Sequence, residues 1–397
     1  SATHMTIDDP IEAAKPFRLD PTSVDRPVVF EVLVELDGCG YRYRIEADRY
    51  RVVRELLDFQ DAAPRSGWVT LIDRSAGQDR CDLHWRVGST ARRHRLVEDT
   101  RDNALILSRA AERNVELVLP LYRWFQDGVC HIQAGRGPGS DYPAIARLAE
   151  EASQDTELMQ RIAALLRDAD TGITAVDTSV INLDRTSCVG EGLDQLADDE
   201  RQRVTLLLEE VSRIASRGEE LEDLRLYRFE FRRAAGTAAD EVAWDMSSES
   251  HGTIRYLRLL GELMLRLAKG RLLAIDELHT ALHPELAGRL LQLVHGPEFA
   301  RAGAQLLFTT HDATLMNSEL LRRDQIVLVN KKPDGTSEVY SLWEFEDLPR
   351  REERWSRHYL AGRFGGLPVF GPRLADVEQS EEPTPVDRPG REQSRAG

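Results

Sequence analysis

The sequence predicts an α/β fold built on a central parallel sheet, and two short apolar runs carry that prediction. The first is Leu272–Ile275, four apolar residues in a row, and the second is the strand-like run of residues 305–309, whose three middle residues are apolar. Short apolar runs of this kind suit strands that are covered on both faces, as the strands of parallel sheets are. Between the runs, His283-Pro284 is expected to open a helix with the proline in its first turn. We therefore expect both runs to be parallel central strands.

Two adjacent carboxylates, Asp276 and Glu277, directly follow the first run. Ligands of open parallel sheets bind just beyond the carboxyl ends of the strands. An acidic residue there can hold magnesium, directly or through a water, and the next one can polarise a water against a γ-phosphate. We assign the magnesium to Asp276 and the water to Glu277. For the dipeptide alone, a strand that ends in a solvated acidic turn is the simpler interpretation.

A helix start lies one helix before the carboxylates. Residues 248–253 read SESHGT, residues 254–268 carry apolar side chains at helical spacing, and Gly270 fits a stop just beyond the helix. Serine hydroxyls, a glycine and free backbone N–H groups at a helix N-terminus form an anion site. An ordinary serine N-cap is the alternative, and the position of the segment before the carboxylate strand favours the anion site.

The second run is followed by Thr310, His311 and Asp312. A histidine at a strand's end can sense a γ-phosphate, because imidazole can donate a hydrogen bond to it. A lone histidine more often has a structural role, but its place one strand after the carboxylates favours the sensing role. His279 and His283 have the i, i+4 spacing of zinc ligands. Neither the sequence around them nor a nearby third ligand supports zinc.

These motifs, in this order, resemble the prokaryotic AAA/ABC-type ATPases of the abortive-infection and OLD-like group, which are related to RecF and SMC heads. The resemblance covers most of the chain. It extends to PFRLDP, FEVLVELDG, YRYRIEAD, RRDQIVLV and YLAGRFGGLP, at residues 16–21, 30–38, 41–48, 322–329 and 359–368. It implies an ABC-type P-loop NTPase head, with a RecA-like lobe around a parallel central sheet, an antiparallel β lobe and a helical insertion.

The resemblance also implies a composite site in which two copies, or one copy and a homologue, enclose ATP and Mg²⁺. One subunit would supply Asp276 for magnesium, Glu277 as the base and His311 as the switch histidine. The other would supply Ser250 and Gly252, which match the serine and second glycine of the family's signature loop. The implied partners are a second copy or a higher oligomer and a separate, nuclease-like effector controlled in anti-phage defence.

The sequence departs from the family's pattern in two places. His251 stands where the signature loop has its first glycine. A P-loop, G-x4-G-K-S/T, holds phosphates with backbone N–H groups and a lysine, and none of the four lysines lies in such a motif. GRGPGS, at residues 135–140, lacks the lysine and is predicted to be a loop. Because the family's P-loop precedes the PFRLDP-like segment, we expect a sequence shortened at its N-terminus, a misassigned start at Met5, or a natural ATPase remnant. The chain as written is expected to be inactive.

The chain is predicted to divide into five segments. These are an N-terminal remnant (1–25), a β-rich lobe with helices (26–143), a helical segment or lid (144–222), an α/β ATPase lobe (223–370) and a disordered tail (371–397). Period-two patterns predict antiparallel strands at 28–36, 41–47, 51–58 and 67–72. Helices are predicted at 103–113, 116–125, 144–168 and within 193–222, and strands return at 224–245. The tail is rich in Pro, Glu and Arg and poor in apolar residues, which predicts disorder.

Composition favours a cytoplasmic protein. No apolar run reaches the roughly twenty residues of a membrane span, and no signal-peptide pattern opens the chain. The four cysteines have no metal or redox spacing. A net charge of −16 argues against broad nucleic-acid affinity, which needs positive surface, although a local patch such as ARRHR at residues 91–95 stays open. Two alternatives to the ATPase are a DNA-repair-type ATPase clamp and a catalytically inactive, ATPase-derived interaction module.

Overall fold

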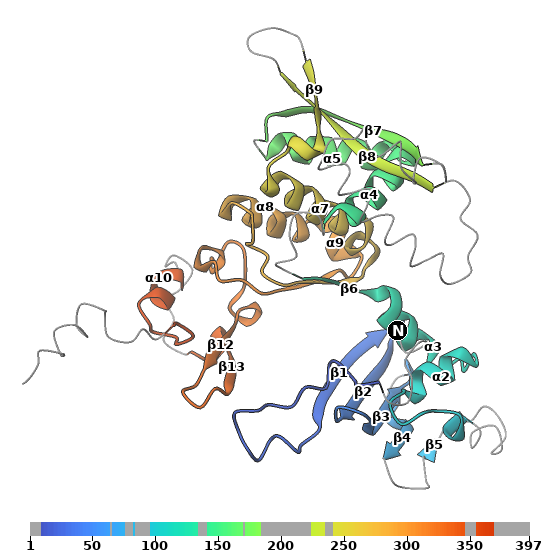
Figure 1. The fold of residues 1–397 in the computed structure, drawn as a ribbon. Coiled ribbons are helices and arrows are strands. Elements are labelled where there is room, and N and C mark those ends of the chain that lie inside the picture. Colours follow the sequence, from blue (N-terminus) through green and yellow to red (C-terminus); the bar gives the residue numbers. More distant parts are fainter. Residues whose placement is uncertain are drawn as a thin grey trace, which may run out of the picture. The chain divides into compact units, whose positions relative to one another are not determined.

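Figure 1 shows the computed structural model, which describes residues 9–63, 66–75, 82–83, 96–133, 141–169, 171–183, 224–234, 241–345 and 355–368. Packing divides the chain into two units, Ser1–Leu321 and Arg322–Gly397, so the segment predicted as one α/β lobe contributes to both. The predicted helix within 193–222, the GRGPGS loop, the ARRHR patch and the predicted disordered tail lie outside the described residues.

An antiparallel sheet of five strands forms the β-rich part of the first unit; its first four strands were predicted, and the short fifth was not. Its strands pair in sequence order: β1 (Val28–Leu36), β2 (Cys39–Ala47), β3 (Val52–Gln60), β4 (Val69–Ser75) and β5 (Asp82–Leu83). Asp37 and Gly38 both have positive φ, 52° and 79°, in the two-residue turn between β1 and β2. Such Asp-Gly turns match the twist of the paired strands and so set their register.

Two short helices pack on this sheet: α2 (Ile106–Glu112) and α3 (Leu119–Arg123). They form one hydrophobic core with buried residues of β2, β3 and β4, among them Tyr41 and Leu57. In the region of the helix predicted at 116–125, the α-helix ends at Arg123, and the chain continues as a π-helix, Trp124–Gly128. That segment leads directly into the next strand, β6 (Val129–Ile132).

A buried carboxylate joins the sheet to α2. Glu55 of β3 is fully buried and accepts hydrogen bonds from the backbone N–H groups of Ile106 and Leu107, at 2.7 and 2.9 Å, and from the Tyr43 hydroxyl at 2.9 Å. It thereby satisfies N–H groups at the start of α2, where no local side chain caps the helix. Burial raises the pKa of the Glu55 carboxyl above its ordinary value, against the opposing effect of these hydrogen bonds.

A parallel sheet holds the two apolar runs. Its order is β11 (Gln305–Phe308), β10 (Leu272–Ile275) and β6, and all pairs are parallel. The parallel pairing was predicted, but the prediction that both runs are central is wrong for the described residues: β10 is central and β11 is an edge strand, with Leu307 63% exposed. The third strand comes from the segment that the sequence assigned to the β-rich lobe.

Five helices contribute to the main core, which also buries Ile132, Leu273 and Ile275 of this sheet. They are α4 (Tyr142–Gln154), α5 (Thr156–Asp168), α7 (His251–Leu265), α8 (Pro284–Val294) and α9 (Pro297–Arg301). The predicted helical segment at 144–168 consists of two helices, and Asp155 caps α5 by accepting from two of its N–H groups. Gly270 has φ 73° and ends the segment after α7, and His283 caps α8, as the sequence indicated.

A second antiparallel sheet contributes to the same core. Its strands are β7 (Ile173–Leu183), β8 (Leu224–Ala234) and β9 (Glu241–Asp245), paired in the order β7-β8-β9. Strand β7 was not predicted. Phe229 and Phe231 of β8 point to one face, stack at 6.4 Å and are fully buried in the core that also contains α7. This shared core positions the sheet against the start of α7.

The second unit contains the hairpin of β12 (Val327–Lys331) and β13 (Ser337–Ser341), and α10 (Trp355–Leu360). In the predicted turn, the carboxylate of Asp334 accepts hydrogen bonds from the backbone N–H and from the hydroxyl of Thr336. The glycine-rich segment after α10 packs on the hairpin, where the Tyr340 hydroxyl donates to the Phe364 carbonyl at 2.5 Å. Among the helices that the structure describes, none has both the length and the apolar composition to cross a bilayer.

Candidate functional site

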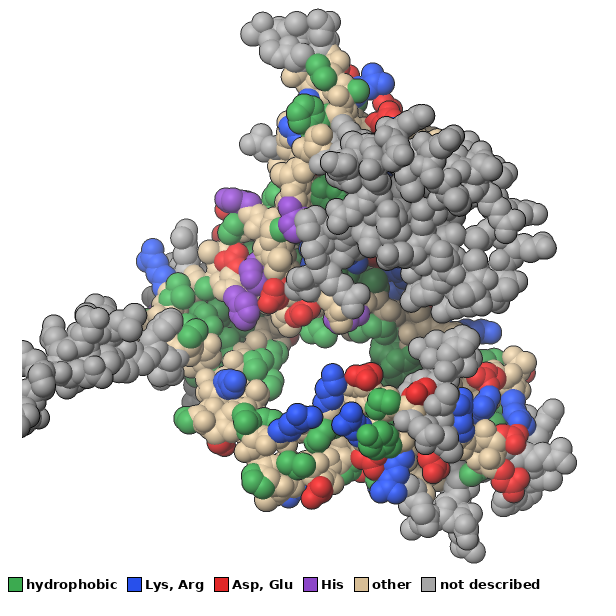
Figure 2. Space-filling model, viewed as in Figure 1, with side chains coloured by type: hydrophobic (Ala, Val, Ile, Leu, Met, Phe, Trp, Pro, Cys, Tyr) green, Lys and Arg blue, Asp and Glu red, His purple; other side chains and the backbone are tan. Residues whose placement is uncertain are grey.

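The carboxyl ends of β10 and β11 lie at one edge of the parallel sheet, and they bring three of the predicted site residues together. Asp276 and Glu277 follow β10, and His311 comes three residues after β11 ends. The backbone joins the two loops, because Thr309 N–H donates to the Ile275 carbonyl at 3.0 Å and Leu278 N–H donates to the Thr309 carbonyl at 2.9 Å. Histidine and acidic side chains gather on the face that carries these loops (Figure 2).

Thr309 ties the two carboxylate positions to each other. Its hydroxyl donates to Oδ1 of Asp276 at 2.6 Å and accepts the backbone N–H of Glu277 at 2.8 Å. The Asp276 carboxylate is thereby oriented while it stays exposed. No role was predicted for Thr309; its position as the polar last residue of the second run was the only signal.

Glu277 occupies an uncommon backbone conformation. Its φ is 49°, in the left-handed region that residues other than glycine rarely adopt. The Thr280 hydroxyl donates to Oε2 of Glu277 at 2.9 Å, which fixes the carboxylate as well as the backbone. Strained residues of this kind persist where surrounding structure over-determines them, and they are common at functional sites.

His311 is exposed and lies against His279. The two rings meet edge to face with centroids 5.5 Å apart. Nδ1 of His279 accepts the backbone N–H of His311 at 3.4 Å and lies 3.2 Å from the Thr310 hydroxyl. His279 therefore holds the segment that carries His311, which gives a structural use to a residue that the sequence had raised only as a zinc candidate.

Gln133 is a further polar residue at the same edge, and it was not among the predicted site residues. It directly follows β6, and the Asp276 N–H donates to the carbonyl of the preceding residue, Ile132, at 2.8 Å. The side chain of Gln133 is exposed, and its amide oxygen is a type of ligand that hard cations accept. Strand β6, which Gln133 follows, is far from its partner β10 in the sequence. Only the order of strands in the sheet therefore shows that Gln133 follows a strand next to the one that Asp276 follows.

Ser250 and Gly252 lie at the start of α7, as the sequence predicted, and not at the carboxyl edge itself. Ser250 is the N-cap, with its hydroxyl accepting the Thr253 N–H at 3.1 Å. The first N–H groups of a helix have no intrahelical acceptor, so those of His251 and Gly252 are candidate anion donors. A Cβ at Gly252 would lie 2.9 Å from the Ala281 carbonyl oxygen, so the helix start packs closely on the loop after β10.

The carboxyl edge suits magnesium, while the phosphate cradle is not among these residues. Mg²⁺ is usually held by one or two carboxylates together with waters and substrate phosphates. An oriented and exposed Asp276 fits that pattern, and within the described residues no group of three or more His, Cys, Asp or Glu side chains forms a complete metal cage.

The chain matches the sequence model of a known protein family. The sequence model of the family described as "AAA domain, putative AbiEii toxin, Type IV TA system" matches residues 13–317. No curated protein matches the chain.

Proposed function

The chain belongs to this family of AAA domains, and from that membership we propose that it is the catalytic part of an ABC-type ATPase that binds ATP with Mg²⁺ and closes as a dimer around it. The single observation that carries the proposal is the bridge made by Thr309, which places the oriented Asp276 carboxylate beside Glu277 at the carboxyl edge of the parallel sheet. Open α/β sheets bind ligands at that edge.

Each residue at the edge has a chemical role in the proposal. Asp276 would hold the magnesium ion, with the amide oxygen of Gln133 beside it. The bound ion would neutralise charge on the phosphates. Glu277, held by Thr280, would take a proton from the attacking water, and His311 would donate a hydrogen bond to the γ-phosphate. Phosphoryl transfer needs mostly such positioning and charge stabilisation, which rigid, pre-oriented groups supply.

The helix start at Ser250 and Gly252 is proposed to serve the nucleotide of a partner subunit. Its N–H groups and positive helix end favour a phosphate. The family's description names a putative toxin of a type IV toxin–antitoxin system. We accordingly propose that the ATPase controls a separate, nuclease-like effector in anti-phage defence. An inactive interaction module is the second candidate, and the lack of a G-x4-G-K-S/T motif in the sequence favours it.

Testing the trans role needs a protein with a phosphate cradle, here named the P-loop form: this chain preceded by a segment that carries a P-loop. In the P-loop form, Ser250→Ala and Gly252→Asp should each lower ATP hydrolysis while ATP binding by the dilute monomer is unchanged. The aspartate should have the larger effect, because its Cβ would meet the Ala281 carbonyl and its charge would repel phosphate. Phosphate release and equilibrium ATP binding are the measurements.

Matched controls are available away from the helix start. Ser153→Ala removes an exposed hydroxyl on α4 that bonds only its own helix, and Gly67→Asp places a carboxylate where a Cβ has nothing within 4 Å. Both should hydrolyse ATP normally. Loss of monomer ATP binding in Ser250→Ala would show that the loop serves its own subunit's nucleotide, contrary to the proposal.

A further inference from the structure

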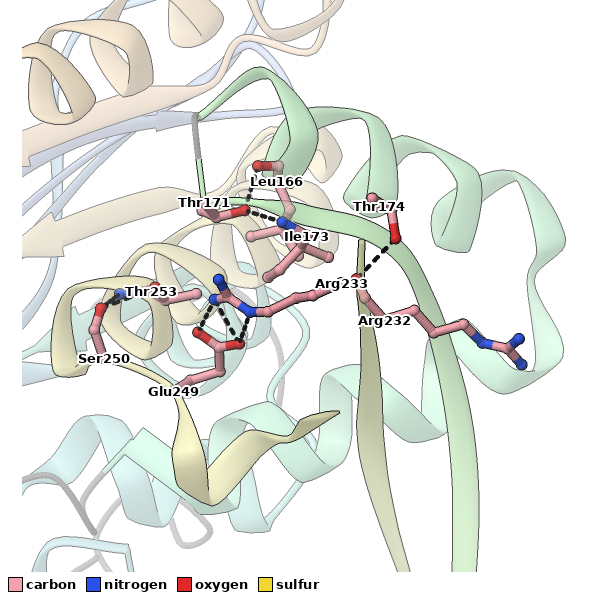
Figure 3. Close-up of polar contacts among 9 residues, drawn as sticks. All are labelled: Leu166, Thr171, Ile173, Thr174, Arg232, Arg233, Glu249, Ser250 and Thr253. Carbon is pink, nitrogen blue, oxygen red and sulfur yellow. Dashed lines mark hydrogen bonds and ion pairs between the residues drawn. The ribbon is translucent and has the colours of Figure 1, made fainter. Parts of the chain in front are cut away.

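Two neighbouring arginines of β8 point to opposite faces of the β7-β8-β9 sheet, and they differ in what they contact (Figure 3). Arg232 points to the exposed face and pairs with Asp177 at 3.0 Å; both side chains are about half exposed. Arg233 points the other way and reaches Glu249, the residue before Ser250. The second arginine thus connects the sheet to the start of α7.

The contact between Arg233 and Glu249 is bidentate and buried on the carboxylate side. Nη2 of Arg233 lies 2.8 Å from each carboxylate oxygen, and Nε lies 3.2 Å from Oε1. The Glu249 side chain is only 1% exposed. An ionised carboxylate so far from water depends on its partner, because the desolvation cost is met only by a close, hydrogen-bonded opposite charge.

The Arg233 guanidinium has two further neighbours, a tryptophan ring and a glycine turn. It lies over the Trp244 ring, 5.7 Å from the centroid. On the β7 side, a Cβ at Gly172 would come within 3.1 Å of Nη1, and Gly172 has φ +72°. Thr171 holds that turn, since its hydroxyl donates to the Leu166 carbonyl at 2.8 Å and accepts the Ile173 N–H at 3.3 Å (Figure 3).

We propose that Arg233 is a positioning residue for the anion-binding start of α7. It fixes Glu249 to the β7-β8-β9 sheet, and through Glu249 it fixes Ser250 and Gly252. The N–H of Glu249 also donates to the Met246 carbonyl at 3.2 Å, so the turn that enters the helix is held at backbone and side chain. Sheet and helix start then keep one orientation. The inference rests on the proposed function only for the statement that this helix start binds phosphate.

Hydrogen exchange on the full chain tests the positioning without any nucleotide. In Arg233→Ala, amide exchange in residues 248–253, where the N–H groups of Glu249 and Thr253 are hydrogen bonded, should speed up by about tenfold or more, as expected for a locally released segment. Peptides from α8 and from the β1–β5 sheet should be unchanged. Arg233→Lys should lie between, because lysine keeps the charge but not the two-pronged geometry. The matched control Arg232→Ala should exchange like the parent protein.

Two further variants keep the test decisive if Arg233→Ala does not fold. Gly172→Ala crowds the guanidinium without removing either charge and should raise exchange in the same residues. The double variant Arg233→Glu with Glu249→Arg should restore part of the protection lost in Arg233→Glu alone. Unchanged exchange at residues 248–253 in both Arg233→Lys and Gly172→Ala, or equal effects in Arg232→Ala, would overturn the positioning role.

The P-loop form separates this inference from the proposed function. There Arg233→Ala should lower kcat at least about tenfold with little change in KM. A misplaced start of α7 would lose contacts that it makes in the transition state more than contacts that bind the substrate. If exchange rises at residues 248–253 while kcat stays normal, the positioning role stands and the phosphate role of the helix start is wrong. If exchange is unaffected, the positioning role is wrong whatever the kinetics.

Discussion

Glu277→Gln in the P-loop form is expected to lower the rate of ATP hydrolysis by about 10²- to 10⁴-fold, the usual contribution of a general base. Glutamine has nearly the same shape and can still accept from the Thr280 hydroxyl, so the strained backbone at Glu277 should persist. It cannot take a proton from water. Asp276 and its bond to Thr309 are untouched, so magnesium and ATP should still bind, and ATP-bound dimers should accumulate.

Phosphate release gives the rate, and sedimentation in the presence of Mg²⁺ and ATP gives the dimer population. Glu319→Gln, a change at an exposed glutamate of the same unit, is the matched control and should hydrolyse ATP normally. An unaffected Glu277→Gln enzyme would exclude Glu277 as the base. A variant that loses ATP binding as well would indicate that Glu277 holds the nucleotide or the metal and not the water.

Glu55→Ala should lower the free energy of unfolding by about 3 kcal/mol, since each buried donor left without an acceptor costs about 1–3 kcal/mol. Three donors lose their acceptor at once: the N–H groups of Ile106 and Leu107 and the Tyr43 hydroxyl. Denaturant unfolding of the full chain measures the loss. The control Glu31→Ala removes an exposed ion pair with Arg44 and should change stability by less than about 1 kcal/mol.

The same carboxyl predicts a pH dependence with a definite sign. Burial raises the pKa of Glu55 above its ordinary value of 4.5, so the folded protein binds this proton more tightly than the unfolded chain does. The stability that this proton contributes is therefore full below pH 4.5 and is lost as the pH rises through the raised pKa. Glu55→Gln should remove that part of the pH dependence. An identical pH profile in parent and Glu55→Gln proteins would contradict the raised pKa.

Local sequence patterns predicted the elements whose residues are adjacent along the chain. The apolar runs became parallel strands, Gly270 ended the segment after α7, and the order of motifs placed Asp276, Glu277 and His311 at one edge. Each of these follows from spacing or from a residue's intrinsic preference. The family match over residues 13–317 confirms the resemblance that the same motifs indicated.

Features that depend on distant pairing could not be predicted in this way. Strand β6 joins the parallel sheet from a segment that reads as part of another lobe, so Gln133 was missed as a neighbour of Asp276. Thr309 matters because its hydroxyl bridges two residues of another loop. Arg233 and Glu249 are 16 residues apart and become partners only when β8 packs near the start of α7.

The most direct test of the central claim compares phosphate release from Mg²⁺-ATP by the 397-residue chain and by its P-loop form. Asp276 and Glu277 alone offer a triphosphate two negative charges, and nothing in the sequence replaces the backbone cradle and lysine of a P-loop. We expect background release by the chain as written and magnesium-dependent turnover by the P-loop form. Full turnover by the chain as written, or none by a folded P-loop form, would contradict this expectation.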